Sequence, residues 1–158
     1  MRLEEAHRPA DKVEALLAVK KGPMSNDYHE VNKLLSGKED SMVRLNAFRT
    51  MLVVPHPSAP LSLVEALEEE KEPKILERMC RALIPYSGEH MGGIVTEFAS
   101  LTPEARDKIK ELLKKHNAPE DHPLLVDLIV PKEEPKETPK EEPKENPKTN
   151  LDDLFKPF

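Results

Sequence analysis

Residues 41–52 read SMVRLNAFRTML, and residues 73–84 read PKILERMCRALI. Each stretch places apolar side chains three and four positions apart, the spacing of one buried face of an α-helix. The apolar row of the first stretch recurs 32 residues later in the second: Val43, Ala47 and Met51 are followed by Ile75, Met79 and Leu83. We therefore expect two equivalent helices with Met51 and Met79 in the core.

Helical spacing continues on both sides of these stretches. Further apolar rows lie at residues 13–17, 31–35, 61–67, 94–101, 109–113 and 124–129. Pro73 and Pro103 occupy the first turn of a helix, where the missing N–H of proline costs nothing. No run alternates polar and apolar residues over the length of a strand. We expect an all-α domain over residues 1–130.

Pairs of these helices recur along the chain. Val64 is followed by Ile94 after roughly 30 residues, and a Pro- or Gly-containing turn joins the two helices of each unit. Residues 39–130 thereby resemble the HEAT-like α-helical repeat proteins, and the resemblance implies a short solenoid that grips a protein or peptide. The resemblance implies no catalytic residue. An irregular helical bundle is the alternative.

The domain is followed by a low-complexity segment. Residues 131–150 read PKEEPKETPKEEPKENPKTN, a Pro-Lys tetrapeptide repeated five times. Proline at every fourth position prevents a helix, and no apolar side chain offsets the entropy of ordering the chain. We expect a disordered, extended linker.

The last eight residues, LDDLFKPF, carry apolar side chains again. Fully burying each such side chain stabilises a contact by roughly 1.5–3 kcal/mol. We expect this peptide to dock on another protein, so that a non-enzymatic adaptor is tethered to its partner. The candidate partner-binding residues are Leu151, Asp152, Asp153, Leu154, Phe155 and Phe158. There are two alternatives: the peptide folds back to cap or autoinhibit the solenoid, or it has no role.

Residues 150–155, NLDDLF, resemble the peptide by which bacterial replication and repair proteins bind the sliding clamp. Leu151, Leu154 and Phe155 match its apolar anchors, while Asn150 stands where a Gln is expected. This resemblance implies an alternative function, a DNA replication or repair accessory factor recruited to the clamp.

Composition limits the classes of partner. Lys and Arg number 24 against 30 Asp and Glu, a formal net charge of -6. Without a basic stripe, we do not expect direct contact with nucleic acid. No apolar run reaches the roughly 20 residues of a membrane span, and the N-terminus lacks a basic-then-apolar leader, so we expect a cytoplasmic protein. A second protein partner on the solenoid face remains open.

Chemical motifs do not favour an enzyme. The sequence has no metal-binding His-Glu spacing, no phosphate-binding glycine loop and no nucleophile elbow, so we expect no catalytic residue, metal or cofactor. The single Cys80 is expected to be buried. The acidic run from Glu68 to Glu72 is expected to be a solvated face, His122 is expected in an exposed loop, and Gly92-Gly93 should allow close helix packing.

Overall fold

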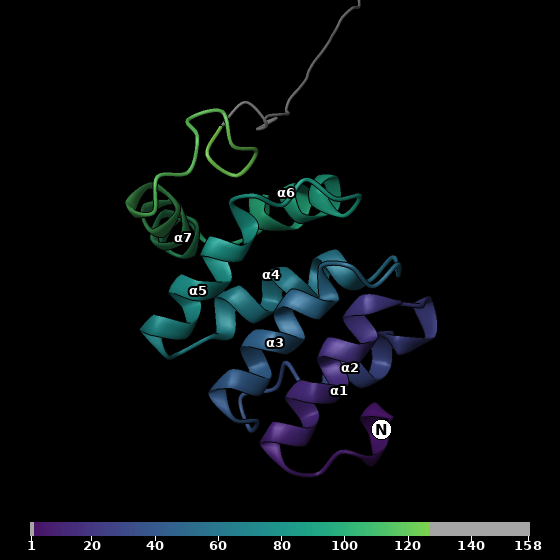
Figure 1. Cartoon of the computed structure of the whole chain (residues 1–158). Helices are drawn as coiled ribbons and strands as arrows, with labels where there is room; N and C mark the ends of the chain where they lie inside the picture. The colour runs from purple at the N-terminus through teal and green to yellow at the C-terminus, as the bar shows by residue number, and fades with distance from the viewer. Residues whose placement is uncertain (1, 127–158) are drawn as a thin grey trace, which may run out of the picture. The chain divides into compact units, whose positions relative to one another are not determined.

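The computed structural model describes residues 2–126, and every regular element in that range is a helix (Figure 1). The α-helices are α1 (Pro9–Lys21), α2 (Tyr28–Lys33), α3 (Ser41–Met51), α4 (Ala59–Glu69), α5 (Pro73–Leu83), α6 (Met91–Ala99) and α7 (Pro103–Lys115). Two short 3-10 turns, η1 (Leu3–Glu5) and η2 (Ser25–Asp27), precede α1 and α2. The predicted all-α fold class is confirmed for the described residues. The expected linker, 131–150, and docking peptide, 151–158, lie outside them, as do residues 127–130.

The described helices pack as one compact unit that ends at Leu125. One row of helices runs α1, α3, α5 and α7, each packed on the next (Figure 1). A second row places α4 against α6, while α2 packs on α3. The starts of α3 and α5 are 32 residues apart, as are those of α4 and α6, which agrees with the interval of the apolar rows. Membership of the HEAT-like class stays a prediction.

The core lies between the two rows. Met51 and Met79 are 0% and 1% exposed, as predicted for the inner face of α3 and α5. Cys80 is also buried, and burial raises the pKa of its thiol to about 12. Leu17, by contrast, lies on the surface although its spacing placed it on the core face of α1.

Close packing of α4 on α6 depends on one glycine. A Cβ atom on Gly93 would lie 2.7 Å from Cγ of Pro60, so a side chain there would push the two helices apart. A Cβ atom on Gly92 would meet nothing within 4 Å. The predicted role in helix packing is therefore confirmed for Gly93 and wrong for Gly92.

The segment after α7 differs from its expected helix. Residues 123–125 form a turn, and the rest of the apolar row at 124–129 lies almost wholly outside the described residues. Pro119 and Pro123 interrupt helical hydrogen bonding here. Leu124 is nevertheless buried, so its side chain covers the core without a helix.

Candidate functional site

The partner-binding residues predicted from the sequence all lie in residues 151–158, outside the described part of the chain. The structure therefore neither brings them together nor separates them. Within residues 2–126, a buried network around Arg44 and an open groove across α1, α3 and α5 each combine polar groups with a defined geometry.

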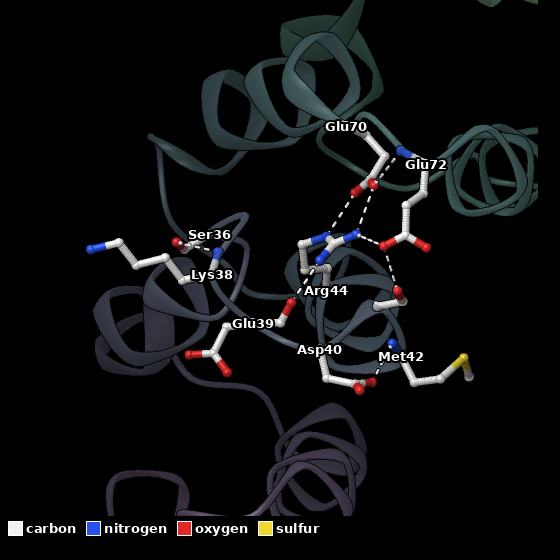
Figure 2. Close-up of polar contacts among 9 residues, drawn as sticks. Ser36, Lys38, Glu39, Asp40, Met42, Arg44, Glu70 and Glu72 are labelled. Atoms are coloured by element: carbon white, nitrogen blue, oxygen red, sulfur yellow. Dashed lines mark hydrogen bonds and ion pairs between the residues drawn. The ribbon is translucent and has the colours of Figure 1, made fainter.

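Arg44 lies on α3 and binds two carboxylates from the connection between α4 and α5 (Figure 2). Its Nε donates to Oε1 of Glu70 at 2.9 Å, and its Nη2 donates to Oε2 of Glu70 at 2.8 Å. The same Nη2 donates to Oε2 of Glu72 at 2.7 Å, and Nη1 donates to the backbone oxygen of Glu39 at 2.6 Å. The Arg44 and Glu70 side chains are only 9% and 3% exposed, so this bidentate pair is removed from water.

Further hydrogen bonds fix the carboxylates in place. Ser41 Oγ donates to Oε2 of Glu72 at 2.6 Å, and the backbone N–H of Glu72 donates to Glu70 at 3.1 Å. The hydrogen bond from Ser41 and that from Arg44 lower the pKa of Glu72, while Glu70 raises the pKa of Arg44. The network thus holds the start of α3 against the end of α4. Because the carboxylates are committed to these donors, a structural role is favoured over acid–base chemistry.

This network corrects the expectation that Glu68 to Glu72 form a solvated face. Glu68 and Glu69 are exposed, but Glu70 is buried because it neutralises Arg44. One sequence signal could have indicated this. Arg44 stands between Val43 and Leu45 in an otherwise apolar stretch, and a buried arginine requires an anionic partner.

The groove lies at one end of the helix row, over α1, α3 and α5. It has a volume of about 270 Å³ and is open to solvent. Two cationic side chains and five apolar or aromatic ones line it: Lys20, Arg49, Leu52, Val53, Ala82, Pro85 and Tyr86. We call this set the α1–α3–α5 groove. No carboxylate is among its lining residues.

Each of the two cations lies near the end of its helix. Lys20 lies in the last turn of α1 and Arg49 in the last turn of α3, where positive charge stabilises the carbonyl end of a helix. Within residues 2–126, neither side chain forms an ion pair or hydrogen bond. Both charges are therefore available to an anionic group from outside the domain.

The apolar part of the groove is fixed by Tyr86. Its hydroxyl donates to the backbone oxygen of Leu52 at 3.0 Å and accepts from the backbone N–H of His90 at 3.2 Å. Burial raises the pKa of this hydroxyl. Beside it Val53 is 39% exposed, and Leu17, one helical turn before Lys20, is 47% exposed. Exposed apolar surface thus lies next to two cations that have no partner in the described residues.

Sequence reasoning missed this groove, because its lining residues come from three segments whose nearest members are 29 positions apart. Lys20, Arg49 and Tyr86 are unremarkable singly, and each charge is expected at a helix end. The 32-residue interval offered a signal, since it places Leu17, Arg49 and Arg81 at equivalent positions of successive helices.

The described part of the chain shows neither a metal site nor a membrane-spanning helix. Across residues 2–126 no three His, Cys, Asp or Glu side chains gather as a metal site would require. No helix described here has both the length and the apolar character needed to cross a membrane. Compared with known proteins, the chain matches no family model, no curated protein and no solved structure.

Proposed function

We propose that this chain is a non-enzymatic interaction adaptor with two binding parts. The helical domain binds one protein through the α1–α3–α5 groove, and residues 151–158 bind another. The observation that carries the proposal is the groove itself, where exposed apolar side chains adjoin two cations with no partner in the domain. The HEAT-like interpretation of the repeated helices supports the same function.

The groups in the domain that could perform chemistry are engaged elsewhere. The Cys80 thiol is buried, with a pKa of about 12, and so is a poor nucleophile at neutral pH. The carboxylates of Glu70 and Glu72 accept hydrogen bonds from Arg44. These assignments favour binding over catalysis. The proposal includes the cytoplasmic location expected from the sequence, where a free thiol stays reduced.

The Pro-Lys-Glu segment, 131–150, joins the two binding parts in this proposal. At about 3.1 Å per residue, an extended segment of this length spans up to ~60 Å. Two proteins bound to one chain would then meet at a high effective concentration, in the millimolar range for short flexible linkers. The adaptor would favour their association without any contact between its own parts.

The test is a pull-down with four forms of the chain, of which the unaltered full chain is the reference. We expect a chain ending at Asn150 to lose one set of proteins. The full chain carrying Lys20→Glu and Arg49→Glu should lose a different set. Lys114→Glu is the matched control, because Lys114 is also an exposed cation in the last turn of a helix and lies outside the groove.

The full chain and the Lys114→Glu variant should recover both sets. Recovery of the same proteins by all the forms, or of no specific protein by the full chain, would contradict the adaptor proposal. A drop in melting temperature on removal of residues 151–158 would instead favour the fold-back alternative.

A further inference from the structure

We infer that the α1–α3–α5 groove binds a short acidic peptide that carries Leu or Phe anchors and is presented by a partner protein. This inference rests on the proposed adaptor function and names the class of partner for its helical domain. Three properties of the groove carry it: the sign of its charge, the chemistry of its floor and its size.

The charge of the groove is positive although the chain as a whole is acidic. Lys20 and Arg49 line it with no carboxylate among the other lining residues, and Arg81, in the last turn of α5, directly precedes the lining residue Ala82. The formal net charge of the chain is -6, so this end of the helix row differs locally from the average. A guanidinium binds a carboxylate through two parallel hydrogen bonds, so Arg49 can fix the register of an acidic peptide.

The residues that line the groove favour a peptide over a nucleic acid as the ligand. Five of the seven lining residues are apolar or aromatic, and Val53 offers exposed apolar surface for an anchor. The Tyr86 hydroxyl is already engaged by two backbone groups. A nucleic-acid site commonly contacts about 6–10 phosphates, whereas this groove offers two cations. Acidic side chains flanking an apolar anchor match both parts of the groove.

The size of the groove favours a few peptide side chains over a whole small molecule. A volume of about 270 Å³ lies just below the ~300–1,000 Å³ of typical small-molecule and cofactor sites. The groove is also open, so most of a small ligand would stay in water. A few side chains of an extended or helical peptide would fill it, with the rest of the peptide crossing the ends of α1, α3 and α5.

The experiment measures fluorescence polarisation of labelled peptides titrated with the full chain. The probe is the peptide DELDELFE. Its controls are KKLKKLFK, which reverses the charge, and DESDESSE, which removes the anchors. A labelled DNA duplex of about 20 base pairs tests the nucleic-acid alternative. We expect the acidic apolar probe to bind with a dissociation constant of about 10–100 µM and the other three to bind at least tenfold more weakly.

Variants locate the binding in the groove. Lys20→Glu and Arg49→Glu should each weaken binding about tenfold, the usual effect of losing one charge-assisted hydrogen bond. Val53→Ser should weaken it severalfold, because it removes exposed apolar surface. Lys114→Glu should leave it unchanged. None of the three cations has an ion pair or hydrogen bond to lose within residues 2–126. Circular dichroism of each variant checks that the domain is still folded.

Each outcome decides the inference. Tighter binding of DNA or of the cationic peptide, or equal loss in the Lys114→Glu control, would overturn it. A probe that binds only after Leu154→Ala and Phe155→Ala would still support it and would show that the chain's own acidic, apolar end competes for the groove. If the probe binds neither the full chain nor its Leu154→Ala, Phe155→Ala variant, the inference is overturned. The adaptor function is contradicted only by the pull-down results given for it above. The two can thus be told apart.

Discussion

Removing the Arg44 guanidinium should destabilise the domain strongly. Arg44→Met keeps an unbranched apolar stem but leaves the Glu70 carboxylate, 3% exposed, without its two guanidinium hydrogen bonds. An uncompensated buried charge of this kind costs about 3–5 kcal/mol. The whole free energy of unfolding of a domain is about 5–15 kcal/mol, so this one change should remove a large share of it.

Changing Glu70, the partner of Arg44, gives a sharper test. Glu70→Leu in the Arg44→Met background removes the orphaned carboxylate, and an apolar pair of similar volume is often as stable as a buried ion pair. We therefore expect the double variant to be more stable than Arg44→Met alone by at least about 2 kcal/mol.

Urea unfolding followed by far-UV circular dichroism measures each free energy, provided that the transition is two-state. Arg49→Met is the matched control. It removes an arginine from the same helix that has no partner in the described chain, and it should cost less than about 0.5 kcal/mol. A loss below about 1 kcal/mol for Arg44→Met, or a double variant no more stable than the single one, would refute the reasoning.

Three further predictions test the packing, the pH response and the tail. Gly93→Ala should lower stability because its Cβ would lie 2.7 Å from a proline of α4, whereas Gly92→Ala, with open space around it, should be neutral or stabilising by up to about 1 kcal/mol in a melting experiment. Because the folded-state pKa of Glu72 is lowered from 4.5, its contribution is present above that pH and is lost as pH falls through the lower folded value, so Glu72→Gln should flatten the acid side of the stability profile. Changing Leu154 and Phe155 together to Ala should abolish recovery of the tail's partner in the pull-down while leaving the melting temperature unchanged; recovery of every partner would defeat the docking hypothesis.

Helix positions could be predicted because they depend on local spacing. The rows that contain Met51 and Met79 repeat at 3.6-residue periodicity, and Pro73 and Pro103 indicate where helices begin, as the structure confirms. Leu17 obeyed the same local rule and is exposed, because no neighbouring helix covers that face of α1. Periodicity identifies an apolar face and does not say what packs against it.

The histidines show why polar contacts could not be predicted. His122 was expected in an exposed loop, yet it is 4% exposed, with Nε2 lying 3.0 Å from the backbone oxygen of Leu83. Its Nδ1 accepts from the backbone N–H of Leu124, so Nε2 is the nitrogen that carries the proton and donates. The ring satisfies a carbonyl at the end of α5 that water would otherwise bind. That partner lies 39 residues away, and no local pattern indicates it.

The groove arises from the repeat and not from any single residue. A basic residue in the last turn of a helix is stabilising by about 0.3–1 kcal/mol, which accounts for Lys20, Arg49 and Arg81 one at a time. Because α1, α3 and α5 pack in sequence, Lys20 and Arg49 line one groove with the residues that end α5, and two separate helix-end effects act at one place. Helix stability explains the charges, but it does not explain why the exposed apolar surface of Val53 adjoins them or why no acidic residue lines the groove. A stack that needed only stable helix ends could have paired those cations with the many glutamates of the chain. Leaving them unpaired beside apolar surface favours a binding role for that edge, which the peptide titration tests directly.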